Sequence, residues 1–246
     1  AAEQKNTSAQ SHLGWMYSRG MGVQQNYKMG AKWTTLAAKQ GNAQAQAHLG
    51  WMYSHGLGVR QNHKAAFQLA TLAAKQGNAR AQSNLGVNYA NGQGVPQSNK
   101  LAVKWFTLAA EQKYANAQFH LGNMYLAGRN GFPLDIKLAA KWLTLAAQQG
   151  GPRAQAHLGA LYFRGMGVPH DYKVALKWYT LSAEQGNPAA QAVLGGMYAN
   201  GQGVRQNYIR SHMWWNIAAS EELASGLGLA RQEFVKIQKD MTPDEV

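Results

Sequence analysis

The stretch Ala45-Gln46-Ala47-His48-Leu49-Gly50 decides the fold, because its pattern Ala-Gln-x-x-Leu-Gly returns along the whole chain. The pattern begins at Ala9, Ala45, Ala81, Ala117, Ala154 and Ala190. Successive copies are 36 residues apart, with one extra residue between the fourth and the fifth. A fixed period of this length indicates stacked structural repeats. The extra residue falls within 128–132, where it is expected to lengthen a loop and leave the helices unchanged.

The first half of each copy predicts a helix. In the first copy, Ala9, Leu13 and Tyr17 lie four residues apart with Met16 adjoining, which places them on one helix face. Gly14 and its equivalents fall inside this helix, where glycine costs on the order of 1 kcal/mol relative to alanine. We therefore expect a second helix to approach these glycines closely. The Gly-x-Gly-Val that follows is expected to end the helix through positive φ, with its valine closing the core.

The second half of each copy predicts another helix. Residues 173–185 carry Ala175, Trp178 and Leu181 at helical spacing, and Gly186-Asn187 then ends the segment. A tryptophan recurs at one position of this helix and is predicted to lie in the core: Trp33, Trp105, Trp142, Trp178 and Trp214, with Leu69 in the second copy. Such a helix pair is too small to bury its apolar face alone, so neighbouring copies must stack.

These motifs resemble those of a known family. The run Ala-Gln-x-x-Leu-Gly-x-x-Tyr-x-x-Gly-x-Gly-Val, followed by Tyr-Lys-x-Ala-x-Lys-Trp and Ala-Ala-x-Gln-Gly-Asn, is similar to the Sel1-like repeat family. The resemblance implies an all-α fold, a right-handed α/α superhelix (solenoid) of about six helix-pair repeats. It also implies adaptor or scaffold roles, and no reaction. The segment 214–219 together with Met241-Thr242-Pro243 resembles the closing repeat of bacterial relatives.

The repeat pattern also predicts the division of the chain. The solenoid is expected over 1–220, with the tail of a truncated repeat at 1–8 and repeats at 9–44, 45–80, 81–116, 117–153, 154–189 and 190–222. Residues 223–246 are predicted to form a C-terminal capping helix and the start of a further helix. Leu227, Ala230, Phe234 and Ile237 give this cap an apolar face at helical spacing.

Composition limits the classes of function. The absence of cysteine excludes disulfides, thiolate nucleophiles and Cys-ligated zinc. The formal net charge of +13 favours anionic partners such as acidic protein faces, phosphates or anionic lipid, although solubility alone explains such a charge equally well. No apolar run is long enough for a membrane span. Bacterial Sel1-like proteins are frequently exported, so the resemblance implies a periplasmic or secreted protein, with a cytoplasmic one as the alternative.

The motifs of catalysis and cofactor binding are not found. Gly-x-Gly-Val follows a predicted helix, whereas a dinucleotide loop follows a strand and contains a third glycine. His12, His48, His120 and His157 occupy one column, but equivalent sites in stacked repeats lie roughly 10 Å apart, too far for a shared zinc ion. We therefore predict a protein that is not an enzyme and that has no cofactor and no metal site.

The first helix of each copy carries the candidate binding surface. By similarity to tetratricopeptide proteins, positions 8, 11, 12, 15, 18 and 19 and their equivalents are predicted to face a concave groove. The candidate partner-binding residues in these columns are His12, Trp15, Arg19, His48, Trp51, His55, His120, Asn123, His157 and Arg164. Aromatic and cationic groups together are typical of binding hot spots. Alternatively, Trp15 and Trp51 pack against the neighbouring second helix.

Lysines form two further columns on the second helices, where they indicate either a solvated outer face or a surface for polyanions. They are Lys28, Lys64, Lys100, Lys137 and Lys173, and one turn later Lys32, Lys104, Lys141 and Lys177. The favoured function is a monomeric interaction scaffold that docks an acidic peptide or protein in the groove near the first two copies. The alternative is binding of RNA or another polyanion, with the tryptophan and histidine columns as stacking groups.

Overall fold

The computed structural model describes residues 6–128 and 133–225, the last five of them as helical backbone only. Within these ranges every regular element is an α-helix, which confirms the predicted all-α class. The helices are α1 (Thr7–Arg19), α2 (Tyr27–Lys39), α3 (Ala43–His55), α4 (His63–Lys75), α5 (Ala79–Asn91), α6 (Asn99–Glu111), α7 (Ala115–Ala127), α8 (Ile136–Gln148), α9 (Pro152–Arg164), α10 (Tyr172–Ala183), α11 (Pro188–Asn200) and α12 (Tyr208–Ser225).

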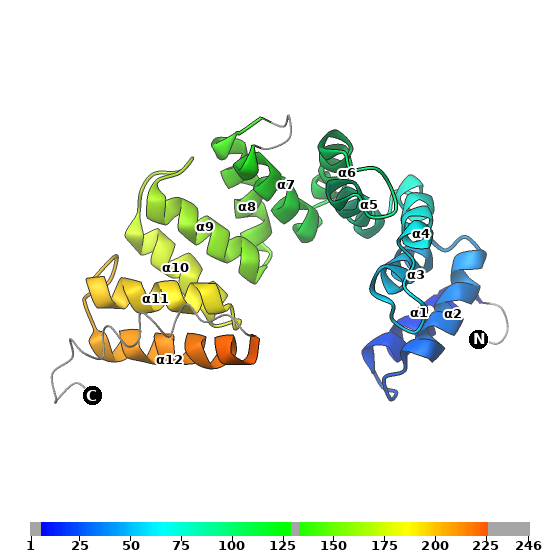
Figure 1. Cartoon of the computed structure of the whole chain (residues 1–246), viewed down its shortest axis with the longest axis horizontal. Helices are drawn as coiled ribbons and strands as arrows, with labels where there is room; N and C mark the ends of the chain where they lie inside the picture. Colours follow the sequence, from blue (N-terminus) through cyan, green and yellow to red (C-terminus); the bar gives the residue numbers. More distant parts are fainter. Residues whose placement is uncertain (1–5, 129–132, 226–246) are drawn as a thin grey trace. The chain divides into compact units, whose positions relative to one another are not determined.

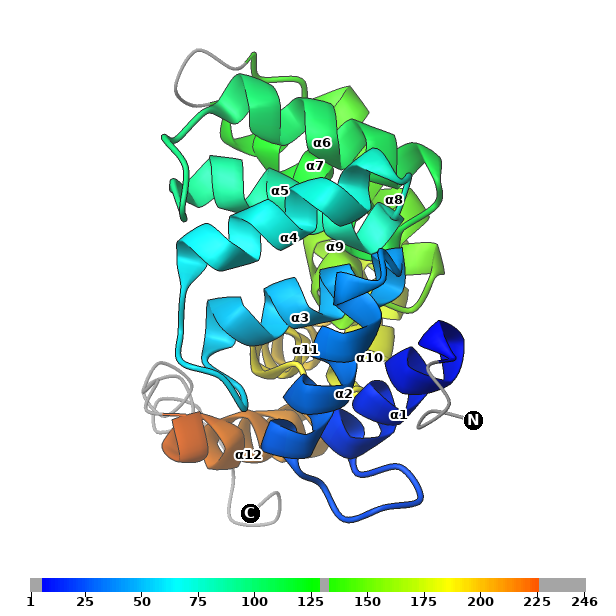
Figure 2. The ribbon, with the colours of Figure 1, turned by 90° about the vertical axis from the view of Figure 1, so that its right-hand side faces the viewer.

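The helices belong to two compact units. Unit 1 contains α1 to α6 and the part of α7 up to Leu121, and unit 2 contains α7 from Gly122 onward with α8 to α12. In unit 1, α1 packs on α2, α3 on α4 and α5 on α6, and α2 and α4 also pack on the first helix of the next pair (Figure 1). In unit 2, α8 to α12 each pack on the helix that follows or precedes them in the chain (Figure 1; Figure 2 turns the view by 90°). Stacking of helix pairs confirms the predicted solenoid of repeats.

Asparagines and glycines set the ends of the first helices. The Asn42 side chain accepts a hydrogen bond from the Ala45 backbone N–H at 2.9 Å, and Asn6, Asn78 and Asn187 cap their helices in the same way. At the other end Gly20 has φ of 69°, a left-handed conformation that side chains disfavour. Gly56, Gly92, Gly165 and Gly201 repeat it. The predicted glycine stops are therefore confirmed.

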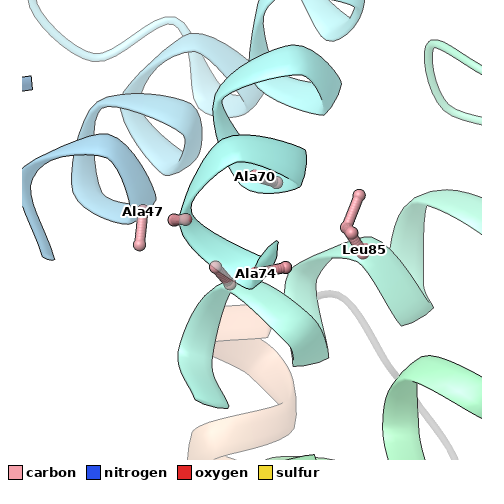
Figure 3. Close-up of a cluster of buried hydrophobic side chains, with 6 residues drawn as sticks. Ala47, Ala70, Ala74 and Leu85 are labelled. Atoms are coloured by element: carbon pink, nitrogen blue, oxygen red, sulfur yellow. The ribbon is translucent and has the colours of Figure 1, made fainter. Parts of the chain in front are cut away.

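Small side chains dominate the core. In unit 1 one cluster joins α3, α4 and α5 through Ala47, Ala70, Ala73, Ala74, Ala81 and Leu85 (Figure 3). In unit 2 the corresponding cluster contains larger groups, among them Tyr179 and Met197. Buried alanines allow helices to pack at short distance, so the stack is held by many small contacts.

A buried glutamine ties each of the first helices α3, α5 and α9 to the second helices before and after it. Gln46 donates a hydrogen bond through Nε2 to the carbonyl of Ala38 at 3.2 Å, and its Oε1 accepts one from Gln76 at 2.8 Å. Gln82 and Gln155 each make the same pair of contacts, Gln82 with Ala74 and Gln112, and Gln155 with Ala147 and Gln185. The Gln of the motif therefore satisfies its own buried amide and links successive repeats, a role that the sequence analysis missed.

The predicted close approach at the motif glycine is confirmed. A Cβ added to Gly86 would lie 2.5 Å from the ring of Phe106, so the second helix carries a side chain directly against the glycine. The residue at this place, here called the slot residue, is Thr34, Ala70, Phe106, Leu143, Tyr179 or Trp215 in the six repeats.

The tryptophan column precedes the slot residue by one position. Its members are half-buried and cover the core, as Trp105 does in unit 1 and Trp214 in unit 2, so their assignment to the core itself was wrong. One residue turns the helix by roughly 100°, which brings the next position, and not the tryptophan, to face the first helix.

Several predictions fall outside the described residues. They concern the truncated repeat at its first five residues, the inserted loop at 129–132, and the capping helix from residue 226 onward. Residues 223–225, which were predicted to begin that cap, are the last residues of α12. In the part of the chain that is described, no helix combines the length and the apolar character needed to cross a bilayer.

Candidate functional site

Two adjoining clefts lie along the first helices of unit 1. Cleft 1 has a volume of about 520 Å³ and is lined by His12, Trp15, His48 and Arg80 together with serines, asparagines and Gln44. Cleft 2 has a volume of about 660 Å³, and its wall includes Arg19, Trp51 and His55. Arg80 lines both clefts and therefore stands at their junction.

The predicted site residues are distributed over three clefts. His12, Trp15 and His48 lie in cleft 1, and Arg19, Trp51, His55 and His120 in cleft 2. His157 and Arg164 line a third cleft, cleft 3, in unit 2. Asn123 lines none of these clefts, and its buried Oδ1 has no hydrogen-bond partner among the described residues. The structure thus groups seven of the ten predicted residues in unit 1.

One position assigned to the groove is wrong. Ser18 is buried, and its hydroxyl donates a hydrogen bond to the carbonyl of Gly14 at 2.8 Å. A Cβ on Gly30 would collide with the Ser18 hydroxyl, so the serine points at α2. Ser18 follows Gly14 by one helical turn and shares its face, which explains why it packs against the second helix.

Arg80 lines both clefts, and it is the candidate site residue that the sequence analysis missed. It lies in the first turn of α5, at the position equivalent to Ser8, which was predicted to face the groove. Its guanidinium carbon is 6.0 Å from the centroid of the Trp51 ring, within the range of a cation–π contact. Burial lowers the pKa of Arg80, an effect that Tyr114 opposes and the nearby Arg19 strengthens. The guanidinium group of an arginine stays charged at neutral pH, so Arg80 brings a partly desolvated cation to both clefts.

The two groove tryptophans present their rings to the clefts. Trp51 is half-buried, with the rings of His48 and His55 at centroid distances of 5.9 and 5.0 Å. Trp15 is also half-buried, 6.0 Å from the ring of His12. Both indoles line a cleft on the first-helix side. They therefore offer flat apolar surface beside cationic and polar groups.

His48 is neutral at physiological pH. Burial, with further contributions from Arg80 and then Arg19, lowers the pKa of its imidazole to about 4. His48 therefore contributes a neutral ring that can donate or accept a hydrogen bond, and Arg19 and Arg80 are the arginines that line the two clefts.

The charge around these clefts is one-sided. No acidic residue occurs between Glu3 and Glu111, a stretch that contains eleven lysines and arginines. The two lysine columns of the second helices are exposed, and none of their members lines cleft 1 or cleft 2. The clefts therefore hold fixed arginines without a carboxylate, while the lysines face solvent elsewhere.

Cleft 3 in unit 2 differs in character. It has a volume of about 370 Å³ and is lined mainly by apolar groups such as Leu126, Leu161 and Val193, in addition to His157 and Arg164. Burial and the neighbouring Arg153 lower the pKa of His157. Burial raises the pKa of Tyr179 to about 12, against an opposing effect of Arg164. Cleft 3 is a smaller and less polar surface than the clefts of unit 1.

The histidine column does not gather into a metal site in the described part of the chain. No group of three or more histidine, cysteine, aspartate or glutamate side chains there could hold a metal ion.

A family model describes the whole stack of helix pairs. The Sel1 repeat model matches residues 7–42, 43–78, 79–114, 115–151, 152–187 and 188–222. The chain belongs to the Sel1 repeat family. Each matched repeat begins at the first residue of α1, α3, α5, α7, α9 or α11. The Sel1 repeat is a protein-interaction fold, so the family fits a scaffold better than an enzyme.

Solved structures of bacterial proteins share the fold. A Sel1 repeat protein from Oxalobacter formigenes is 35% identical, with a TM-score of 0.77 over 87% of this chain and 86% of that one. A protective antigen of uropathogenic Escherichia coli is 31% identical, with a TM-score of 0.65 over 99% of this chain and 59% of the antigen. An immunity protein from Pseudomonas aeruginosa, 18% identical, has a TM-score of 0.57 over 87% of this chain and 81% of that protein, which shows a common fold. The search of curated proteins finds no match.

Proposed function

We propose that this Sel1 repeat protein is an interaction scaffold that holds an acidic segment of a partner protein in clefts 1 and 2. The observation that carries the proposal is the pair of clefts meeting at Arg80, in a stretch of chain with eleven basic residues and no acidic one. A partner carboxylate placed there would meet Arg80 and Arg19 with no competing carboxylate from the scaffold.

The composition of the clefts supports a macromolecular partner. Trp15 and Trp51 provide large rigid rings, and Arg80 lies over one of them. Tryptophan and arginine dominate the energetics of protein interfaces because they combine wide apolar contact with directed hydrogen bonds. The two clefts follow each other along α1, α3 and α5, so an extended segment can pass from one to the other.

The placement of lysines favours a protein over a nucleic acid. Binding to RNA relies on many contacts with phosphates, and the columns richest in positive charge lie outside both clefts. Within the clefts the cations are two arginines, enough for one or two carboxylates.

The test compares two single substitutions that remove one charge each. A fluorescently labelled peptide of alternating aspartate and serine, about ten residues long, is titrated into the wild type, Arg80→Gln and Lys64→Gln. Loss of a charge-assisted hydrogen bond should weaken binding by about tenfold in Arg80→Gln. Lys64 is exposed on α4 and outside the clefts, so its variant should change affinity by less than about twofold.

A single-stranded RNA of similar length serves as the competing probe. Tighter binding of the RNA than of the peptide, with Lys64→Gln as damaging as Arg80→Gln, would assign the basic surface to polyanions and overturn the proposal.

A further inference from the structure

One repeat lacks the side chain that fills the space beside its motif glycine. A Cβ added to Gly86 would meet the Phe106 ring at 2.5 Å, and one added to Gly159 would meet the Tyr179 ring at 3.1 Å. At Gly50 the nearest side-chain atom is the Cβ of Leu69 at 3.4 Å, because the slot residue is Ala70. The second repeat therefore has no side chain beyond a Cβ at the place where the third, fifth and sixth repeats carry a ring, and this place is called the vacant slot.

The third repeat shows what the slot accommodates. The ring of Phe106 is 1% exposed and stacks on His120, with centroids 5.0 Å apart and an interplanar angle of 15°. The residue one repeat before His120 is Asn84, so the vacant slot lies between Gly50 and Asn84. Both of these residues line cleft 2, as do Ala66 and Ala70. Cleft 2 thus extends into a space that an aromatic ring occupies in the next repeat, and the cluster around it consists largely of alanines (Figure 3).

A second departure from the repeat pattern lies at the same cleft. Tyr114 stands where α1, α3 and α5 have a capping asparagine, and its side chain lines cleft 2. Lys113, before it, has φ of 62° and stands where the chain has Gly41, Gly77, Gly150 and Gly186 in the equivalent connections. A lost cap and a strained lysine both oppose folding, and such local costs tend to persist where a binding site requires them.

Two arginines line the same cleft as the vacant slot. Arg80 lines cleft 2 and contacts the Trp51 ring, and Arg19 lines the same cleft. The wall of cleft 2 therefore combines small apolar residues, Gly50, Ala66 and Ala70, with the guanidinium groups of Arg19 and Arg80. A ligand that contacts both kinds of group needs an apolar ring and an adjacent negative charge.

We infer that the Ala70 slot is the specificity pocket of the scaffold, and that it takes an aromatic side chain of the partner next to a carboxylate held by Arg80. This assignment rests on the proposed function and adds the sequence preference of the bound segment. It explains why the second repeat, unlike the third, leaves the place of Phe106 open.

The experiment uses two peptides that differ at one residue. Each is about ten residues long and rich in aspartate, with a central phenylalanine in one and alanine in the other. Burial of the ring should make the phenylalanine peptide bind the wild type about tenfold more tightly. Ala70→Phe gives the second repeat the residue of the third, and should bring the phenylalanine peptide down to the affinity of the alanine peptide. Ala70→Leu, which introduces the slot residue of the fourth repeat, should act in the same direction.

Ala160→Phe is the matched control, because it adds the same ring to cleft 3 in unit 2 and should leave the preference intact. Thermal unfolding of each variant establishes that it is folded. Equal binding of the two peptides to the wild type, or an unchanged preference in both Ala70 variants, would overturn the slot alone. Failure of both peptides to bind would overturn the proposed function, and the slot assignment with it.

Discussion

The second and the fifth repeat share one backbone plan and differ in what fills the space between their helices. In unit 2 the ring of Tyr179 packs against Gly159 and helps to line cleft 3. In unit 1 the equivalent residue is Ala70, which leaves cleft 2 open down to Gly50. A repeat scaffold can therefore form a pocket where one repeat has a small residue at a position that a larger side chain fills in other repeats.

The two units also differ in how they cap their second helices. In unit 1 the caps of α2, α4 and α6 are uncharged, namely Asn26, Asn62 and Ser98. In unit 2, Asp135 and Asp171 cap α8 and α10, and Asn207 caps α12. Asparagine and aspartate make the same capping hydrogen bond, but aspartate also brings a negative charge that the helix N-terminus favours. The second helices of unit 1 lack a carboxylate at their caps, and Glu111 is the one acidic residue among the described residues of this unit. Its clefts are thereby left in an uncompensated positive field.

The largest effect is expected from emptying the filled slot of unit 2. Tyr179→Ala should reduce the free energy of unfolding by about 3 to 5 kcal/mol, because it removes a buried ring that packs within the core of α9 to α11. Urea denaturation measures the change. Ala70→Phe, the reverse exchange in unit 1, is the matched variant and should alter stability by less than about 1 kcal/mol. A small loss in Tyr179→Ala would mean that the filled slot contributes little and that the contrast between the units is superficial.

The buried histidine of unit 1 is expected to make stability depend on pH. The pKa of His48 is about 4 in the folded chain and near 6.5 in the unfolded one, so the unfolded chain binds more protons between these values. Stability should therefore fall as the pH drops from 7 to about 4. His48→Asn introduces the residue of the third repeat. In this variant the loss of unfolding free energy between pH 7 and about 4 should be smaller by about 2 to 3 kcal/mol.

The control for this titration is His157→Asn in unit 2. The pKa of His157 is also lowered, by partial burial and by Arg153, but its side chain is more exposed to solvent than that of His48, so a weaker effect is expected. Unfolding curves at a series of pH values compare the two variants with the wild type. Parallel pH profiles for the wild type and His48→Asn would show that the His48 ring is hydrated and not buried.

The motif glycines provide a direct measure of free space in the two units. Gly195→Ala would place a Cβ inside the contact distance of the Trp215 ring, whose Nε1 donates a hydrogen bond to the Ala192 carbonyl at 2.9 Å. We expect a loss of about 2 kcal/mol in unfolding free energy. Gly50→Ala meets its nearest atom, the Ala66 carbonyl oxygen, at 3.2 Å and should stay within about 1 kcal/mol of the wild type. Equal losses in a denaturation experiment would contradict the vacant slot.

The repeat pattern predicted which helix face each residue occupies, and it predicted less well what that residue meets. The columns of His12, Trp15 and Arg19 could be placed beside the clefts because a face follows from helical periodicity. The vacant slot at Ala70 could not be predicted from periodicity, because it depends on the size of the side chain that faces Gly50 from another helix. Arg80 could have been predicted as a site residue, since it occupies the repeat position of Ser8, which was expected to face the groove.

The smallest expected effect concerns the connection that precedes α7. Lys113 has φ of 62°, whereas the equivalent Gly150 and Gly186 of unit 2 adopt such a conformation without a side chain. Lys113→Gly should therefore raise the free energy of unfolding by about 1 kcal/mol, and Gly186→Lys should lower it by a similar amount. Paired thermal and urea denaturation measure both.

Lys113 does not line cleft 2, so Lys113→Gly should leave peptide affinity unchanged. Tyr114 does line cleft 2, so Tyr114→Asn should weaken peptide binding while it restores a helix cap. Weaker binding in Lys113→Gly would instead show that the strained backbone itself positions the Tyr114 side chain in the cleft.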